Sequence, residues 1–232
     1  MKKTLLIAAS MLLMVALFTP NAKAQEWDTG LDIYSSYIWR GAKFGSGPAF
    51  QPYVEFGAGG FAIGAWGSVS SDFDEGFEMD LYAGYEFALS ESSTLGITVT
   101  DYYFGGDWLD GDSHSIEPMV SLGLGGFSLT GAYMFLPDGS EDAEGEEDSG
   151  DMYLEASYSF ENFSIGLGAG DGLYTLHEDD DGMMVDDFGI CNINIGTSKD
   201  IAVTETFTLP VSGSVILNPA TGGFFITVGI SL

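Results

Sequence analysis

The residues of this chain that could take part in chemistry are overwhelmingly carboxylates. The 232 residues include 35 Asp and Glu, six Lys and Arg, two His and one Cys. This composition offers acids, bases and oxygen ligands for hard cations, but few nucleophiles or nitrogen ligands. The lone Cys191 excludes an internal disulfide. The candidate sites are therefore the two histidines, two acidic runs and a set of carboxylates along alternating segments.

The histidines, His114 and His177, are the candidates for a hydrolytic site. His114 is flanked by Ser113 and Ser115, and His177 is followed directly by acidic residues. A hydrolase needs a histidine beside a nucleophile or an activated water. Segments rich in Ser and Asp place such neighbours beside a histidine by chance, so we expect no enzyme. An outer-membrane hydrolase stays as a minor alternative.

The two acidic runs, Asp138 to Asp151 and His177 to Asp187, raise the question of a divalent-cation site. Clustered carboxylates are hard-oxygen ligands suited to calcium or magnesium. The spacing in the first run matches a calcium-binding loop only loosely, so solvated acidic loops are the favoured interpretation. We assign no metal site and expect no cofactor. The weak metal candidates are Asp142, Glu144, Asp148 and Asp151.

The segments that must position these residues alternate between apolar and polar side chains. From Phe77 to Phe87 every second residue is apolar or aromatic, whereas Glu78, Asp80 and Glu86 fall on the other face. One face for lipid and one for water is typical of a strand in a membrane barrel. A soluble β-sandwich also alternates. Short connections alternate with long, acidic ones along the chain, and this favours an antiparallel transmembrane β-barrel over a sandwich.

The alternation predicts an all-β fold with about 12 strands, an even number as in single-chain bacterial barrels. We expect strands at residues 29–40, 49–57, 61–69, 77–88, 94–104, 114–124, 127–136, 151–161, 163–171, 186–198, 206–217 and 223–232. The short turns and both ends of the mature chain would then be periplasmic. The long acidic loops, around residues 70–76, 105–115, 137–151 and 171–186, would be extracellular.

The first 24 residues have the features of a secretory signal peptide. Two lysines precede an apolar run of about 14 residues, and Ala22-Lys23-Ala24 matches a cleavage site. The run is too short for a membrane anchor. We expect residues 25–232 to form one barrel in the bacterial outer membrane. The final strand, residues 223–232, resembles the signal that barrel-assembly machinery recognises, so that machinery is an expected partner.

The charge of the chain excludes nucleic acid as a partner. The expected mature chain keeps Arg40, Lys43 and Lys199 against 35 acidic residues, which gives a net charge of −32. Binding to phosphates requires the opposite sign. A negative field attracts cations and repels anions. We therefore expect small solutes or cations as partners, besides outer-membrane lipid and lipopolysaccharide.

If the apolar faces contact lipid, acidic and small residues line the lumen. The pore-lining candidates are Asp32, Arg40, Glu55, Glu78, Asp80, Glu86, Glu117 and Glu155. Eight-stranded barrels are filled by side chains and 16-stranded ones are wide, so twelve strands predict a narrow, cation-preferring channel for passive diffusion. The alternative is a plugged surface barrel for adhesion or envelope integrity. There Arg40 pairs with acids while Tyr34, Tyr53 and Trp66 fill the interior.

Three motifs near the N-terminus carry a resemblance to a known family. The chain reads YSSYIWRG at residues 34–41, GPAFQPYVEF at 47–56 and GAWGSV at 64–69. This succession resembles the TorF-like family of outer-membrane porins of Gram-negative bacteria. The resemblance implies an outer-membrane channel with Arg40 and Gly41 at the outer end of the first strand. There Arg40 would bridge lumenal carboxylates, and Gly41 would permit a tight bend.

Overall fold

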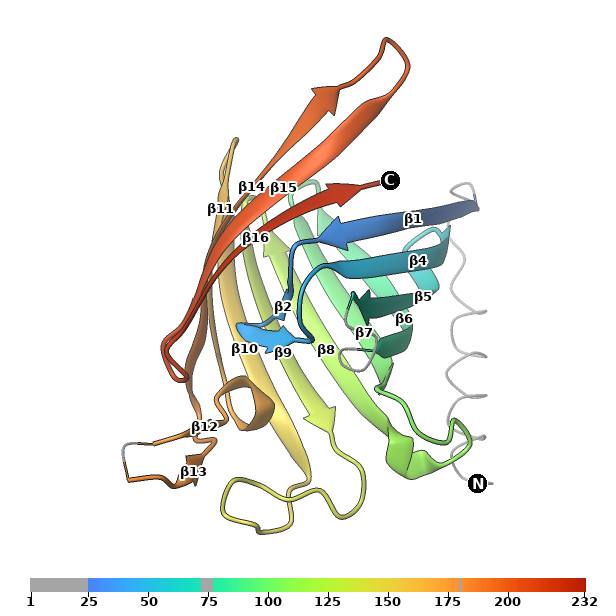
Figure 1. The fold of residues 1–232 in the computed structure, drawn as a ribbon. Coiled ribbons are helices and arrows are strands. Elements are labelled where there is room, and N and C mark those ends of the chain that lie inside the picture. Colours follow the sequence, from blue (N-terminus) through green and yellow to red (C-terminus); the bar gives the residue numbers. More distant parts are fainter. Residues whose placement is uncertain (1–24, 72–76, 180) are drawn as a thin grey trace.

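The structure is a computed structural model that describes residues 25–71, 77–179 and 181–232. The expected signal peptide and the core of the first acidic loop, residues 72–76, lie outside the described residues. Twelve antiparallel strands form a closed barrel (Figure 1). They are β1 (Glu26–Tyr34), β4 (Ala49–Ala58), β5 (Phe61–Ser70), β6 (Glu78–Ser90), β7 (Ser93–Tyr103), β8 (His114–Leu124), β9 (Phe127–Phe135), β10 (Gly150–Ser159), β11 (Ser164–Gly170), β14 (Gly189–Ala202), β15 (Thr208–Asn218) and β16 (Gly223–Ser231). The predicted all-β fold with twelve strands is confirmed.

Two short hairpins and two short helices lie outside the barrel wall in the described residues. The hairpins are β2 (Tyr37–Trp39) with β3 (Ala42–Phe44), and β12 (His177–Glu178) with β13 (Met184–Val185). The 3-10 helices are η1 (Gly111–Ser113) and η2 (Gly172–Tyr174). No helix in the described part of the chain is long and apolar enough to cross a membrane.

The first strand differs from its prediction. The sequence predicted one strand over residues 29–40, but β1 ends at Tyr34 and residues 37–44 turn away as the β2–β3 hairpin. Strand β1 closes the barrel by pairing with β4 on one side and β16 on the other, with Asp32 opposite both Gln51 and Ser231. The prediction was wrong because the backbone leaves the wall after Ser35 and Ser36, and the apolar run of β2 pairs with β3 instead of with a wall strand.

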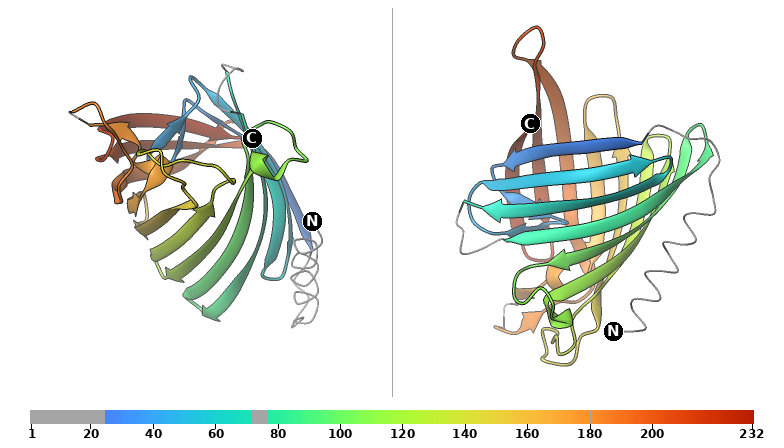
Figure 2. Two further views of the ribbon diagram at one scale, coloured as in Figure 1. Left: turned by 90° about the horizontal axis from the view of Figure 1, so that it is seen from below. Right: turned by 90° about the vertical axis from the view of Figure 1, so that its right-hand side faces the viewer.

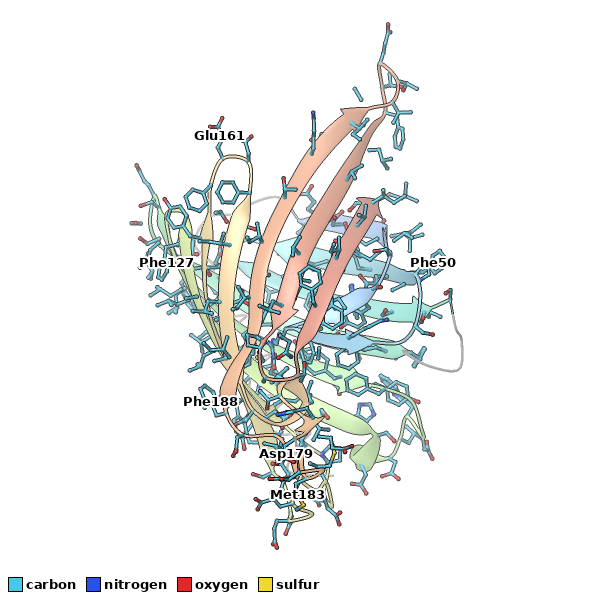
Figure 3. The ribbon with its side chains drawn as sticks, turned by 60° about the vertical axis from the view of Figure 1, so that its left-hand side comes forward. Phe50, Phe127, Glu161, Asp179, Met183 and Phe188 are labelled. Carbon is cyan, nitrogen blue, oxygen red and sulfur yellow. The ribbon has the colours of Figure 1, made fainter. Side chains whose placement is uncertain are left out.

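The two ends of the barrel differ as the connections predict. Short turns join the strands at the turn end, where Glu161 marks one tip, and the acidic loops gather at the loop end, where Asp179 and Met183 lie (Figure 3). The chain ends at the turn end, and the β14–β15 hairpin projects beyond its neighbours there (Figure 1). Seen from the loop end, the β9–β10 loop and the β12–β13 hairpin lie on one side of the barrel mouth, and the loop that contains η1 lies on the other (Figure 2).

The outer face of the wall is apolar because alternate residues of each strand point outward. On β16, Phe224, Ile226 and Val228 are exposed, whereas Thr227 on the other face is buried. Phe50 and Phe127 project outward from opposite parts of the wall (Figure 3). Aromatic pairs lie near both ends of this face. Their members include Trp27 with Phe56 and Tyr158 with Phe160 at the turn end, and Phe77 with Tyr103 and Tyr133 with Phe135 at the loop end.

Candidate functional site

The candidate site is the half of the lumen nearest the loop end, which the β2–β3 hairpin enters. Trp39 pairs with Ala42, so Arg40 and Gly41 form a two-residue turn in which both have positive φ, 51° and 87°. Positive φ at both positions is the geometry of a type I′ hairpin turn. A Cβ atom at Gly41 would overlap the carbonyl oxygen of Cys191 on β14. The turn is therefore pressed directly against the opposite wall of the barrel.

Arg40 at the hairpin tip forms a buried, bidentate ion pair with Glu117 on β8. Arg40 Nη1 lies 2.5 Å from Glu117 Oε2, and Nη2 lies 2.9 Å from Oε1. Arg40 Nη1 also donates a hydrogen bond of 2.7 Å to the hydroxyl oxygen of Tyr174. The guanidinium carbon is 4.5 Å from the ring centroids of both Trp39 and Tyr153. Paired donors and aromatic faces are the surroundings that favour arginine over lysine.

Aromatic rings pack around Arg40 in this half of the lumen. The ring of Trp39 lies 5.3 Å from that of Tyr102 and 5.5 Å from that of Tyr174, and Tyr153 lies 5.2 Å from Tyr174, all as centroid distances. Burial raises the pKa of the Tyr174 phenol in η2, so this residue stays neutral. We call the β2–β3 hairpin with Tyr102, Tyr153 and Tyr174 the lumenal plug.

Asn218 on β15 ties the lumenal plug to the wall. Its Nδ2 atom donates to the carbonyl oxygen of Gly41 at 3.3 Å and to that of Tyr174 at 2.9 Å. Asn218 is buried, so both hydrogen bonds lie in a region shielded from water. Three separate segments, the hairpin, η2 and β15, are thereby held together by one amide group.

Two carboxylates, Glu78 and Asp80, lie on the lumenal face of β6 beside the lumenal plug. The hydroxyl group of Tyr37 donates to Glu78 Oε1 at 3.3 Å. Asp80 lies opposite Trp66 on β5 and Tyr102 on β7 in the sheet. Both carboxylates are buried, and the Asp80 Oδ1 atom has no hydrogen-bond partner.

The half of the lumen nearest the turn end is more open. Glu55 accepts a hydrogen bond of 2.9 Å from the hydroxyl group of Tyr82, and both side chains are partly exposed. A hollow of about 370 Å³ lies at this end, between the β10–β11 turn and β14 and β15. Small lumenal side chains line it, among them Ser164 and Ser214. Lumenal side chains are therefore less closely packed at this end than around the lumenal plug.

The structure separates the eight pore-lining candidates into three environments. Arg40, Glu78, Asp80 and Glu117 meet at the lumenal plug. Glu155 lies next to it and accepts hydrogen bonds from the Tyr153 hydroxyl group and the Asn192 amide. Strand alternation places the other three, Asp32, Glu55 and Glu86, on the lumenal face with greater exposure.

The sequence missed the aromatic residues that pack around Arg40. In the plugged-barrel alternative Tyr34, Tyr53 and Trp66 were the expected fillers. In the structure Trp39, Tyr153 and Tyr174 lie against the guanidinium group, and Tyr102 packs on Trp39. The sequence does contain a signal for Tyr102 and Tyr153, because they are large aromatic residues on strand faces that otherwise carry small and polar residues. Tyr174 lies in a loop and carries no such pattern.

Three of the four weak metal candidates, Asp142, Asp148 and Asp151, line one pocket of about 240 Å³, and Glu144 does not. Asp142 Oδ1 accepts the backbone N–H groups of Glu144 and Glu146, and Asp151 Oδ2 accepts that of Leu173. Asp148 likewise accepts a backbone N–H, and the Glu144 side chain is exposed. Among the described residues, no three His, Cys, Asp or Glu side chains are arranged to hold a metal ion.

The two histidines anchor loops. His114 Nδ1 lies 2.9 Å from Asp101 Oδ1, and Nε2 lies 3.0 Å from the carbonyl oxygen of Trp108. His177 Nδ1 lies 2.7 Å from the carbonyl oxygen of Thr175. Ser115, a proposed neighbour of His114, is buried on the lumenal face of β8, whereas His114 alternates to the other face. In the described residues, the ring nitrogens of both histidines thus contact a carboxylate or carbonyl oxygens and no hydroxyl group.

Comparison with known proteins gives a family and several distant structural likenesses. Residues 21–209 match the family model described as "Bacterial protein of unknown function (Gcw_chp)". No curated protein sequence matches the chain. A solved structure of a NanC porin is similar over 87% of this chain and 97% of its own, with 9% identity and a TM-score of 0.49. An outer membrane channel from Pseudomonas putida F1 is similar over 92% and 95%, with 15% identity and a TM-score of 0.45.

Likenesses at these scores carry no argument about function. The TorF-like name that the N-terminal motifs indicate does not occur in the family description, so that resemblance stays a prediction.

Proposed function

The chain belongs to the Gcw_chp family of bacterial proteins of unknown function, and we propose that it is an outer-membrane channel for small solutes with a preference for cations. The observation that carries this proposal is a polar, acidic lumen inside a closed wall whose outer face is apolar. Only helices and closed barrels satisfy their backbone hydrogen bonds in lipid. The aromatic pairs near both ends of the wall fit the two girdles of such barrels. Outer-membrane lipid and lipopolysaccharide would surround the wall.

The proposed mechanism is passive diffusion through a lumen that the lumenal plug constricts. Lumenal carboxylates lower the energy of a cation in the constriction and raise the energy of an anion. Arg40, the buried cation in this region, is neutralised by Glu117, so it does not cancel the field of the other acids. Solutes would reach the lumenal plug through the open turn-end half and the acidic loops.

Planar-bilayer recording tests the proposal directly. We expect a small conductance whose reversal potential in a potassium chloride gradient indicates cation preference. The variant Arg40→Ala removes the ion pair and ring contacts that hold the hairpin tip, so its conductance should exceed that of the wild type. Lys43→Ala, an exposed change on the same hairpin, is the matched control. Anion preference would contradict the cation-preferring channel. The absence of conductance in both the wild type and Arg40→Ala would contradict a channel of any kind.

The packing of the lumenal plug favours a second candidate, a non-transporting surface barrel that presents its acidic loops for adhesion or envelope integrity. Tyr174 and Glu117 are almost completely buried, so side chains fill the lumen at that level. This candidate predicts that wild type and Arg40→Ala are both silent in the bilayer. The same recordings therefore decide between the two.

A further inference from the structure

We propose that Glu78 and Asp80 form a binding site for a small monovalent cation at the edge of the lumenal plug. The inference deepens the proposed function, on which it rests, because it assigns the cation preference to one pair of carboxylates. Glu78 is 3% exposed and Asp80 is 7% exposed. Two residues apart on one strand, they face the same side of the wall.

The pair has no cationic side chain to balance it. Of the three cationic residues in the described part of the chain, Lys43 and Lys199 are exposed, and Arg40 is bound by Glu117. The described residues show no ion pair to Glu78 or Asp80. Burying a carboxylate without a partner costs several kcal/mol. A positively charged species bound at the pair would remove that cost.

The Asp80 Oδ1 atom shows where the cation would bind. Among the side-chain nitrogen and oxygen atoms of the described residues, it is the one that is buried without a hydrogen-bond partner. A proton shared between Glu78 and Asp80 would still leave one negative charge at the pair. A monovalent cation at Oδ1 satisfies this oxygen and neutralises the remaining charge.

The surroundings limit the charge of the ligand. Trp66 and Tyr102 flank Asp80 across the sheet, and the ring of Tyr37 lies 5.5 Å from that of Trp66. Aromatic rings on these sides offer a favourable π-face to a cation. Calcium takes six to eight oxygen ligands and magnesium a near-octahedral set. Two carboxylates and the Tyr37 hydroxyl group offer fewer protein oxygens than calcium needs. With a proton shared by the pair, the one negative charge that is left matches a monovalent ion.

Three other lumenal acids already have partners. Glu117 is paired with Arg40, and Glu155 accepts hydrogen bonds from Tyr153 and Asn192. Glu55 accepts one from Tyr82 in the more open half of the lumen. The carboxylate pair on β6 is thus the place in the lumen where a bound cation would gain most.

Thermal unfolding of the full-length mature protein in detergent micelles tests the site, with sodium, potassium or choline chloride at constant ionic strength. We expect Tm to rise saturably with sodium or potassium but not with choline, by about 5–10 °C when the ion exceeds its Kd a hundredfold. Asp80→Asn should lose this rise. Glu55→Gln, the matched lumenal control, should keep it. Equal Tm values in all three salts, or an equal rise in Asp80→Asn, would overturn the site.

A second measurement needs no variant that must fold. Sodium-23 relaxation in the presence of the wild-type protein should show a bound fraction that potassium displaces and choline does not. The absence of displaceable sodium would refute the site. These readouts are independent of conduction: sodium binding without conductance would defeat the channel alone, and cation-selective conductance without sodium binding would defeat the site alone.

Discussion

The two halves of the lumen are built from the same strands, but they differ in how far their charged side chains are exposed to water. Near the turn end, Glu55 and Glu86 are partly or fully exposed, and a hollow of about 370 Å³ remains. Near the loop end, a hairpin brings Arg40 against Glu117, and their side chains are only 10% and 2% exposed. Glutamate side chains are therefore solvated in the half near the turn end and packed against other side chains in the half near the loop end. Charge changes near the loop end should cost much more stability.

The largest expected effect comes from Glu117→Gln, which leaves the guanidinium group of Arg40 buried without its ionic partner. Removing one member of a buried ion pair costs about 3–5 kcal/mol. The matched change in the open half is Glu55→Gln, which loses one charge but keeps an oxygen that accepts from Tyr82. It should cost about 1 kcal/mol or less. Denaturant unfolding from lipid vesicles measures both free energies.

A similar loss for Glu117→Gln and Glu55→Gln would remove the distinction between the two halves. The double variant Arg40→Met with Glu117→Met gives a further check. It removes both charges, so no unpaired charge is left, and it should be more stable than Glu117→Gln alone.

The barrel wall could be predicted from the sequence because its determinants are local. Alternation with a period of two assigns each side chain to a face, and turn residues such as Gly59 and Gly125, both with positive φ, mark where strands end. The predicted strand bounds agree within two residues with the structure for ten strands, whereas β14, predicted at 186–198, lies three to four residues later in the chain. The face of each of the eight pore-lining candidates follows from this alternation, except for Arg40, which lies on the hairpin.

The lumenal plug could not be predicted because its contacts join distant segments. Arg40 and Glu117 are 77 residues apart, and Asn218 and Gly41 are 177 apart. Alternation indicates which side chains face the lumen but not which of them meet across it. The one local signal is the Arg40-Gly41 dipeptide between two short apolar stretches, which permits a two-residue turn. Ser35 and Ser36, between β1 and β2, mark the point where the backbone leaves the wall.

The second prediction compares two glycines with positive φ, one in each half. Gly41 has φ 87° and an added Cβ would overlap the Cys191 carbonyl oxygen, whereas Gly59 has φ 67° and no atom within 4 Å of such a Cβ. Both Gly→Ala changes incur the backbone cost of about 1 kcal/mol, but Gly41→Ala should add the cost of displacing the hairpin. We expect a total of about 2–3 kcal/mol for Gly41→Ala. Equal losses for the two variants, measured by denaturant unfolding, would show that the hairpin is not tightly packed against β14.

The smallest expected effect tests whether the burial of charge near the loop end extends into the loops. Burial raises the pKa of Asp171, and Asp148 and Asp186 raise it further, although a hydrogen bond from the backbone N–H of Met152 lowers it. Because the folded pKa lies above the unfolded value of about 3.9, the stability that Asp171 contributes is complete below that pH. It is lost as the pH rises through the folded pKa.

The variant Asp171→Asn should therefore show a smaller decline in Tm as the pH rises above about 4, and a Tm at neutral pH equal to or above that of the wild type. The asparagine oxygen still accepts the N–H of Met152, so this hydrogen bond is kept. Asp28→Asn, at the exposed turn end, controls for the loss of one acidic side chain. If Tm falls equally with pH in Asp171→Asn and the wild type, the effect of burial on charge does not extend from the lumenal plug into this loop.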